Sequence, residues 1–227
     1  MNVTTPSPTS RPVRIDTAGV SLNGDLSIPD NAVGLVVFVH GSGSSRFSQR
    51  NRAVADALSH AQLGTLLLDL LTEAEERTDA VTSEFRFDIP LLAERTTGVV
   101  DWVTATPRIA SLPLGLFGAS TGAAAALIAA AERPQAVRAV VSRGGRPDLA
   151  EAALESVTAP TLLIVGGRDE PVIEVNRRAL DRLPGERELH IVPGATHLFE
   201  EPGALQEVAR LATKWFSDHF RASETGP

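Results

Sequence analysis

A serine stands between two glycines where an apolar run gives way to an alanine-rich one. Ser120 lies in the pattern Gly118-Ala-Ser-Thr-Gly122, and residues 123–131 are mostly alanine. A G-x-S-x-G turn between a strand and a helix is typical of a nucleophile elbow, which exposes the serine hydroxyl. The turn is so tight that side chains two residues before and after the serine would collide, and the glycines remove that collision. The pattern predicts Ser120 as a nucleophile, against the alternative of a chance serine in an ordinary strand–turn–helix.

A serine nucleophile needs a base to remove its proton and a carboxylate to orient that base. In sites of this type the partners follow the serine in the chain order Asp or Glu, then His. Asp169 comes just after the apolar run 161–165, and His197 comes after the run 187–192. Both follow the carboxyl ends of predicted strands, where open α/β sheets bind their ligands. We therefore predict Asp169 as the acid and His197 as the base.

Other carboxylates and histidines fit these roles less well. Asp148, after the preceding strand, is the reserve candidate for the acid, and Glu170 is a more remote one. Of the remaining histidines, His60 ends a predicted helix, His190 lies within a predicted strand and His219 lies on the last helix. His40 precedes a glycine-rich loop. We expect His40 to anchor that loop by hydrogen bonding rather than to act as a base.

Two backbone amides are predicted to stabilise the oxyanion that forms on attack. One is the N–H of Thr121, at the start of the helix after the nucleophile. The other is the N–H of Ser42, in the glycine-rich loop 40–45 that follows an apolar strand. Loss of one such donor typically costs about 3 kcal/mol of transition-state stabilisation.

Alternating strands and helices must hold these residues. Apolar runs predict strands at 33–40, 65–70, 112–117, 137–142 and 161–165, with an edge strand at 187–192 and two earlier strands at 12–17 and 20–27. Helices are expected at 49–61, 90–105, 121–132, 172–182 and 203–221. The segment 71–89 reads as a long acidic loop with a helical turn at most, and Asn23-Gly24 as a hairpin turn or bulge. This alternation indicates an α/β fold with a mostly parallel central sheet flanked by helices.

Composition supports one globular α/β domain at 12–220, between flexible segments at 1–11 and 221–227. The 227 residues are 43% hydrophobic and carry a formal net charge of −7, which argues against a nucleic-acid partner. The chain has no cysteine, which excludes disulfides, thiolate zinc sites and a thiol nucleophile. Without a secretory signal or an apolar run long enough to cross a membrane, the cytoplasm is the expected location and no membrane partner is expected.

Three arginines fall in loops at the predicted catalytic edge: Arg46, Arg143 and Arg146. Guanidinium groups bind carboxylates in a fork geometry, so these residues are candidate ligands for an anionic ester or lactone. The alternative is that they pair with Asp148, Glu170 or the acidic segment 71–89. Phe85 and Phe87 in that segment either shade the site or belong to the core.

With these residues in place, the chain resembles the α/β-hydrolase superfamily, and within it the small dienelactone-hydrolase-like branch. The resemblance covers 12–220 and rests on four motifs: His40-Gly-Ser-Gly-Ser-Ser-Arg46, Phe117-Gly-Ala-Ser-Thr-Gly122, Gly166-Gly-Arg-Asp169 and Gly194-Ala-Thr-His197. It implies an α/β-hydrolase fold and acyl transfer without a cofactor. Dienelactone hydrolases proper use a cysteine nucleophile, which puts the dienelactone substrate in doubt here. Some members occur beside or fused to phosphoribosyltransferases.

The connection between Ser142 and Thr158 is too short for the cap domain that many α/β-hydrolases carry.

The sequence thus predicts a serine hydrolase that cleaves a carboxylic ester, lactone or related acyl bond of a small molecule, through an acyl-enzyme on Ser120. No metal ion or organic cofactor is required. Thioesterase, peptidase and perhydrolase activities use the same triad, and a catalytically silent binding protein is a further alternative. A nucleotide-binding protein is disfavoured, because Gly41-x-Gly43 lacks a third glycine at position 46 and no phosphate-binding G-x-x-x-x-G-K-[ST] occurs. The oligomeric state stays open.

Overall fold

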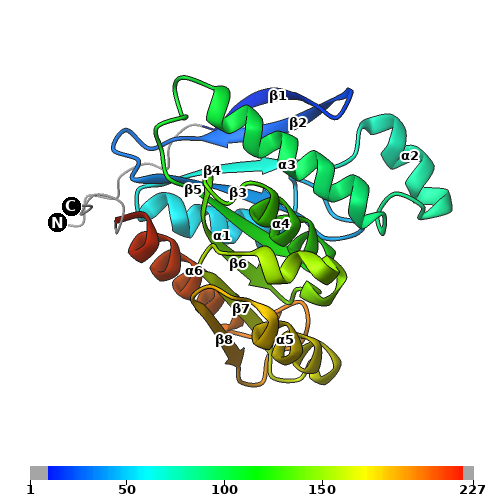
Figure 1. Ribbon diagram of the computed structural model, residues 1–227, viewed down its shortest axis with the longest axis vertical. Coiled ribbons are helices and arrows are strands. Elements are labelled where there is room, and N and C mark those ends of the chain that lie inside the picture. Colours follow the sequence, from blue (N-terminus) through cyan, green and yellow to red (C-terminus); the bar gives the residue numbers. More distant parts are fainter. Residues whose placement is uncertain (1–9, 222–227) are drawn as a thin grey trace.

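The computed structural model describes residues 10–221 and contains an eight-stranded sheet in the order β1-β2-β4-β3-β5-β6-β7-β8 (Figure 1). The strands are β1 (Arg11–Thr17), β2 (Val20–Ser27), β3 (Gly34–Val39), β4 (Leu63–Leu68), β5 (Leu114–Ala119), β6 (Val137–Arg143), β7 (Thr161–Gly166) and β8 (Arg187–Val192). From β4 to β8 neighbouring strands are parallel, whereas β1 and β2 pair antiparallel. The predicted α/β fold with a mostly parallel sheet is confirmed.

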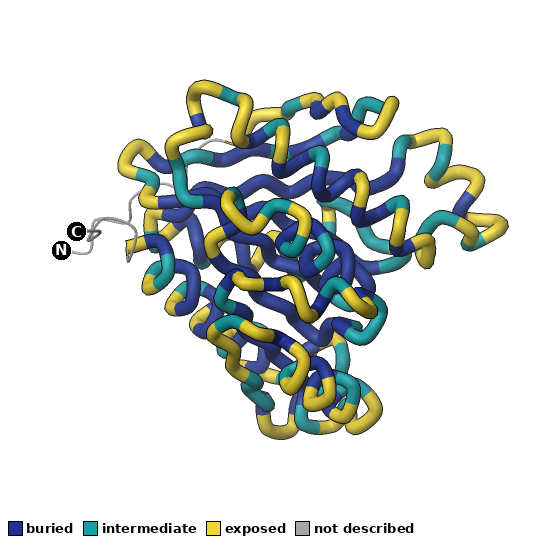
Figure 2. Tube along the Cα trace, in the orientation of Figure 1, coloured by how far each residue is buried: buried dark blue, intermediate teal, exposed yellow. Residues whose placement is uncertain are grey.

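The central strands are buried on both faces, which explains their continuous apolar sequences. Every residue of β3, β4, β5 and β7 is buried, and the tube in Figure 2 is dark blue along this part of the sheet. β8 lies at the sheet edge and is partly exposed, as its mixed sequence predicted. The carboxyl ends of these parallel strands are therefore held in place by a sheet that is packed on both faces.

The N-terminal hairpin turns at a different place from the one predicted. Its two-residue turn is Ala18-Gly19, where both residues have positive φ, 48° and 74°. Asn23-Gly24 lies inside β2 instead. A Cβ on Gly24 would lie 3.1 Å from Leu66 Cδ1 and 3.2 Å from Val13 Cγ2. This glycine reflects close packing between strands rather than a turn.

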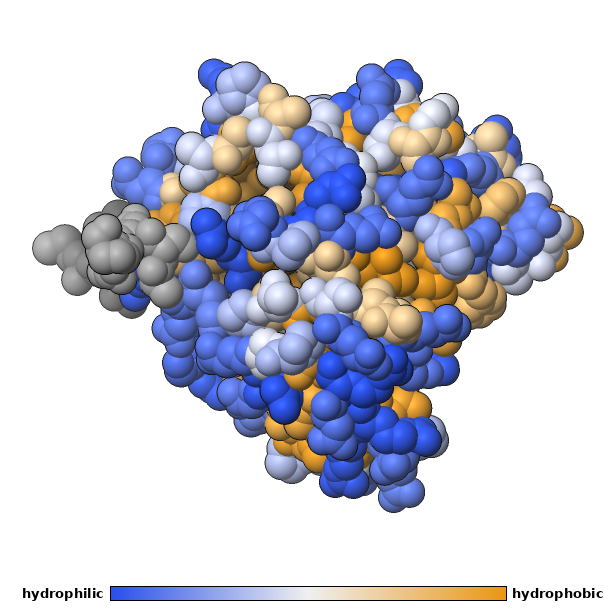
Figure 3. Space-filling model, in the orientation of Figure 1, coloured by the Kyte–Doolittle hydropathy of each residue, from blue (hydrophilic) through white to orange (hydrophobic). Residues whose placement is uncertain are grey.

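Helices cover both faces of the sheet (Figure 1). α1 (Gln49–His60) and α6 (Ala204–Arg221) share one apolar cluster on one face. α3 (Ile89–Ala105), α4 (Thr121–Glu132) and α5 (Glu170–Arg182) contribute to the cluster on the other face. On the face shown in Figure 3, apolar surface is visible to the right of centre, over the region of α3 and α4.

The segment predicted as a loop at 71–89 contains a ten-residue helix, α2 (Glu73–Thr82). Its start is fixed by a capping box, in which Thr72 Oγ1 accepts from Glu75 N–H while the Glu75 carboxylate accepts from Thr72 N–H. The loop prediction was wrong because the segment has too few apolar residues to show a helical stripe. The T-x-x-E pattern was the available signal.

No cap domain interrupts the described chain. The connection between β6 and β7 contains a 3-10 segment, Pro147–Ser156, and returns directly to the sheet. Most of the predicted flexible segments, 1–9 and 222–227, lies outside the described residues, whereas Arg11 begins β1 and Arg221 ends α6. Among residues 10–221, no helix is long and apolar enough to span a membrane.

Candidate active site

Ser120 occupies the sharp turn between β5 and α4. Its backbone has φ 51° and ψ −123°, a conformation that non-glycine residues rarely adopt. Two backbone hydrogen bonds fix it, because Ser120 N–H donates to Arg143 O at 3.2 Å and Arg146 N–H donates to Ser120 O at 3.0 Å. The loop after β6 thus holds the elbow in its strained conformation.

Both glycines of the elbow are required by packing. A Cβ on Gly118 would lie 2.9 Å from Ala123 N and closer still to its Cα. A Cβ on Gly122 would lie 2.8 Å from the carbonyl carbon of His40 and closer still to the carbonyl oxygens of Val39 and His40. The predicted collision within the turn is therefore found for Gly118, whereas Gly122 is required because α4 approaches the end of β3.

Asp169 and His197 meet at the same edge of the sheet. Asp169 Oδ2 lies 2.6 Å from His197 Nδ1, and the carboxylate side chain is 14% exposed while the imidazole is 39% exposed. The loops after β7 and β8 are joined by backbone bonds from Gly167 N–H to Val192 O and from Arg168 N–H to Ala195 O. These bonds bring together two side chains that are 28 positions apart in sequence.

The reserve acid has a different partner. Asp148 accepts two hydrogen bonds from Arg146, at 2.8 and 2.7 Å. The geometry therefore places Asp169, and not Asp148, against His197.

The loop after β6 lies between the elbow and the histidine. Arg143 O holds Ser120, and a Cβ on the next residue, Gly144, would lie 3.5 Å from His197 Cε1. Within residues 10–221, Ser120 Oγ has no hydrogen-bond partner, so its contact with His197 Nε2 stays a prediction. Bonds of this kind are often long in the absence of substrate and tighten when it binds.

The two predicted oxyanion amides come together in an unexpected way. Ser42 N–H already donates to Thr121 Oγ1 at 2.9 Å. A Cβ on the preceding residue, Gly41, would lie 2.9 Å from both Ala119 O and Ser120 Cβ. The loop 40–45 therefore lies directly against Ser120, with the Thr121 side chain as its anchor.

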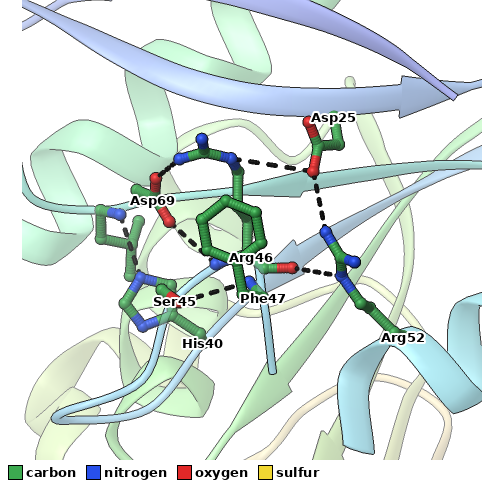
Figure 4. Close-up of polar contacts among 8 residues, drawn as sticks. Asp25, His40, Ser45, Arg46, Phe47, Arg52 and Asp69 are labelled. Atoms are coloured by element: carbon green, nitrogen blue, oxygen red, sulfur yellow. Dashed lines mark hydrogen bonds and ion pairs between the residues drawn. The ribbon is translucent and has the colours of Figure 1, made fainter. Parts of the chain in front are cut away.

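His40 holds the start of this loop, as predicted. Its Nε2 accepts from Leu70 N–H at 3.0 Å (Figure 4). Its Nδ1 lies 2.9 Å from Gly41 O. Burial lowers the pKa of His40 below its ordinary value, although the bond to Gly41 and the charge of Asp69 oppose the shift. The ring is therefore neutral, with Nδ1 as donor and Nε2 as acceptor.

Arg46 belongs to a network of charged side chains (Figure 4). Its guanidinium pairs with Asp69 and lies 3.7 Å from Asp25, while its backbone N–H donates to Asp69 Oδ1 at 2.8 Å. Arg52 also pairs with Asp25, at 3.2 Å. Both guanidinium groups lie over the Phe47 ring, 4.2 and 5.1 Å from its centroid. Arg46 thus has two carboxylate neighbours that the sequence did not indicate.

The other two arginines have different surroundings. Arg146 pairs with Asp148, as the alternative interpretation held. Arg143 is 8% exposed and points toward α1, where its Nη2 lies 3.5 Å from Asn51 Oδ1. Burial lowers the pKa of Arg143 to about 10, and the charge of Arg50 adds to this effect. Arg46 and Arg146 thus have carboxylate partners, whereas Arg143 has none within residues 10–221, and the binding of a substrate anion by these arginines stays a prediction.

A cavity of about 400 Å³ opens beside the oxyanion loop. Its walls come from the loop after β3, the end of β4 and α2, and its charged lining residues are Arg46, Asp69, Glu73, Glu76, Asp79 and Arg86. Ser120 borders the cavity through Gly41 rather than lining it. Sequence reasoning missed Glu73, Glu76, Asp79 and Arg86 as site residues because the segment that carries them contains no catalytic motif.

Of the two phenylalanines in the segment 71–89, one belongs to the core and the other is exposed. Phe85 is partly buried and packs against the main apolar cluster. Phe87 is 60% exposed.

Among residues 10–221, no group of three or more His, Asp or Glu side chains is placed to hold a metal ion.

Comparison with known proteins places this geometry in a family. A family model described as the dienelactone hydrolase family matches residues 51–221. The chain belongs to the dienelactone hydrolase family. Membership of this family makes the chain a hydrolase. Its sheet and flanking helices match those of α/β-hydrolase structures, which places it in the α/β class.

Solved structures agree with this assignment. A dienelactone hydrolase from Anabaena variabilis has a TM-score of 0.93 and 57% sequence identity, covering 94% of this chain and 99% of that chain. Est1E from Butyrivibrio proteoclasticus, in its complex with ferulic acid, has a TM-score of 0.77 at 18% identity, covering 92% of this chain and 99% of that chain. The second similarity shows the shared fold alone.

A curated relative from Mycobacterium tuberculosis carries another name, "Putative phosphoribosyl transferase". It is 58% identical to this dienelactone hydrolase family member over 208 residues, which are 92% of this chain and 46% of the relative. The chain thus spans about half the length of the curated relatives it matches, and the name applies to those longer proteins.

Proposed function

We propose that this chain is a serine hydrolase that cleaves a carboxylic ester, lactone or related acyl bond of a small molecule. The observation that carries the proposal is the 2.6 Å contact between Asp169 and His197 at the sheet edge where the strained turn presents Ser120. The chain contains no cysteine, so a serine must take the place of the thiol nucleophile that the family resemblance implies.

The mechanism follows from these positions. The Nδ1–H of His197 donates a hydrogen bond to Asp169, which leaves Nε2 free to accept the proton of Ser120 as the hydroxyl attacks the carbonyl. The tetrahedral oxyanion receives hydrogen bonds from the N–H groups of Thr121 and Ser42. His197 then protonates the leaving group, and a water molecule activated by the same imidazole releases the acyl group from Ser120.

Ser42 N–H must divide its hydrogen bond between the Thr121 hydroxyl and the oxyanion. Because Thr121 Oγ1 already holds the amide at 2.9 Å, the loop needs little rearrangement to present it to substrate. The position of the amide is thus fixed before substrate binds, and only its hydrogen bond passes from Thr121 Oγ1 to the oxyanion.

Thioesterase, peptidase and perhydrolase activities remain alternatives that use the same residues, and a silent binding protein is an alternative of another class. The three activities differ from an esterase in the bond that is cleaved. The choice of bond depends on the shape of the substrate pocket rather than on the triad.

The test is hydrolysis of p-nitrophenyl esters of increasing acyl length by the wild-type protein and by Ser120→Ala. We expect turnover by the wild type and a fall of ~10⁴–10⁶-fold in the variant. Equal turnover by two folded proteins would contradict the nucleophile assignment. The acyl length that gives the highest kcat/KM measures the depth of the acyl pocket.

A further inference from the structure

Arg143, the last residue of β6, carries a buried positive charge that no carboxylate of residues 10–221 balances. The residue is only 8% exposed, and its side chain points toward the start of α1, where Nη2 lies 3.5 Å from Asn51 Oδ1. Its Nε and Nη1 are buried and have no hydrogen-bond partner in the described part of the chain. Because a buried charge without a partner is strongly destabilising, these N–H groups require an acceptor.

Arg50, in the first turn of α1, brings a second positive charge to the same place. Its charge adds to the effect of burial in lowering the pKa of Arg143 to about 10, so the two guanidinium groups lie near each other. Arg50 Nε is also buried and has no partner between residues 10 and 221. Its Nη1 lies 3.4 Å from an oxygen of Glu200, whose side chain is exposed. An exposed ion pair of this kind compensates little charge, so the two arginines together stay positive.

The start of α1 adds to this positive potential. The helix has twelve residues, begins after its N-cap Ser48 and has no acidic residue in its first turn. The unpaired N–H groups at a helix N-terminus favour a nearby anion and disfavour a cation. Arg50 therefore occupies an unfavourable position unless an anion lies beside it.

Other arginines show how this chain compensates such charges elsewhere. Arg46 pairs with Asp69. Arg95, which is almost fully buried, donates to the Glu75 carboxylate from two nitrogens, at 2.9 and 2.5 Å. Arg143 is as deeply placed in the protein but has no such partner within residues 10–221. The difference indicates that its charge is compensated by a group from outside the chain.

The position of these donors limits what that group can be. Neither Arg143 nor Arg50 lines the cavity beside the loop 40–45, and Nε and Nη1 of Arg143 are closed off from solvent. An ester substrate in that cavity therefore does not reach them. Arg50 is partly exposed, so its side chain can move to admit a small ion from solution. These surroundings suit a free ion of small radius better than a group carried by a substrate.

We propose that Arg143, Arg50 and the start of α1 form a binding site for a small inorganic anion of about the size of chloride. The ion accepts hydrogen bonds from Nε and Nη1 of Arg143 and from Arg50 Nε, and it compensates both guanidinium charges. It also braces the loop after β6, because Arg143 O accepts the N–H of Ser120 at 3.2 Å. This site does not depend on which acyl bond the protein cleaves.

Urea unfolding in mixtures of sodium chloride and sodium gluconate tests the site at constant ionic strength, because gluconate is too large to enter it. A ligand that binds only the folded chain raises the folding equilibrium constant in proportion to its concentration once this exceeds Kd. We expect a rise of up to about tenfold for each tenfold increase in chloride above Kd, and a similar rise with bromide. Equal stability of the wild-type protein in all mixtures would overturn the proposal.

Variants assign the chloride effect to the two arginines. Arg143→Met should lose it and should be at least as stable as wild type in gluconate, because the unpaired buried charge is gone. Arg50→Gln, at a partly exposed position, should weaken it, and this variant serves as the test if Arg143→Met does not fold. Arg178→Met is the matched control, because it removes a positive charge from an exposed position on α5 and should keep the full effect. A chloride effect that persists in both Arg143→Met and Arg50→Gln would contradict the assignment.

Anomalous diffraction from crystals soaked in sodium bromide locates the ion. We expect a bromide ion in contact with Arg143 Nε or Nη1 and with Arg50, and none there in Arg143→Met. A water molecule at this position, without anomalous signal, would overturn the proposal. A rise in KM for p-nitrophenyl glutarate with added chloride, without a change in stability, would make a substrate carboxylate the ligand and would equally overturn the free-anion site. Because unfolding and diffraction need no turnover, they test the site even if the proposed hydrolase function fails.

Discussion

The backbone amide of Ser42 donates a hydrogen bond to the side-chain hydroxyl of Thr121, across 79 positions in sequence. One of these residues belongs to the loop after β3 and the other begins α4, directly after Ser120. The bond ties the two predicted oxyanion donors together. It gives the Thr121 side chain a positioning role that its backbone position alone did not indicate.

Removal of this hydroxyl should weaken catalysis more than substrate binding. In Thr121→Val, an isosteric change, we expect kcat to fall by up to about tenfold with little change in KM, because one hydrogen bond contributes about 1 kcal/mol. Thr121→Ser keeps the hydroxyl and should retain most of kcat. A faster Thr121→Val enzyme would mean instead that the hydroxyl competes with the oxyanion for Ser42 N–H.

The acid of the triad can be assigned by a pair of asparagine variants. Asp169→Asn should lower kcat by ~10⁴-fold, because the amide stabilises the wrong imidazole tautomer. Asp148→Asn should leave kcat within a few-fold of wild type, since Asp148 binds Arg146 rather than His197. Steady-state kinetics on one ester compares them, and the reverse order would make Asp148 the acid.

Packing at the elbow should make Gly122 intolerant of any side chain. Gly122→Ala places a methyl group against backbone atoms of Val39 and His40, so we expect a loss of about 3 kcal/mol or more in the free energy of unfolding. Gly19→Ala is the control, because its Cβ meets nothing within 4 Å and only the positive φ of 74° is unfavourable, at a cost of about 1 kcal/mol. If urea unfolding shows the same loss of unfolding free energy for Gly122→Ala and Gly19→Ala, the backbone around Gly122 has moved to relieve the clash.

The central strands, and the positions of the candidate catalytic residues in the fold, could be predicted from the sequence for physical reasons. Strands buried on both faces need continuous apolar runs, and the nucleophile elbow needs glycines at fixed positions around Ser120. Asp169 and His197 follow from chain order, because each lies in the loop after a parallel strand that ends at the same edge of the sheet as β5. These features depend on neighbours in sequence or on a fixed topology.

The features that sequence reasoning missed depend on tertiary packing. Asn23-Gly24 has the composition of a turn, yet its glycine is explained by Leu66 on a strand that lies far away in sequence. Glu76 and Arg86 reach the site only because α2 folds back over the loop after β3. Ser42 N–H could be predicted as a donor, but its bond to Thr121 requires the two loops to be placed in space.

The buried imidazole of His40 should make the fold sensitive to acid. Burial lowers the pKa of His40 below its ordinary value of 6.5, so as the pH falls the unfolded chain takes up a proton that the folded chain does not. Stability therefore decreases with falling pH below that value, by at most about 1.4 kcal/mol per pH unit for this group.

Urea unfolding between about pH 7.5 and 5.5 tests this effect of a histidine. His40→Gln should be less stable than wild type at the upper pH and should show a shallower dependence on pH. His60→Gln, at the exposed end of α1, should keep the wild-type dependence. An unchanged slope in His40→Gln would show that other groups cause the acid sensitivity.

The central claim is that Ser120 is the activated nucleophile of a triad with His197 and Asp169. Mass spectrometry after treatment with a fluorophosphonate tests it most directly, on wild type beside Ser120→Ala and His197→Ala. We expect one adduct per wild-type chain, on the peptide that contains Ser120, with no adduct in Ser120→Ala and much slower labelling of His197→Ala. An adduct on another residue, or none on the folded wild-type protein, would contradict this account.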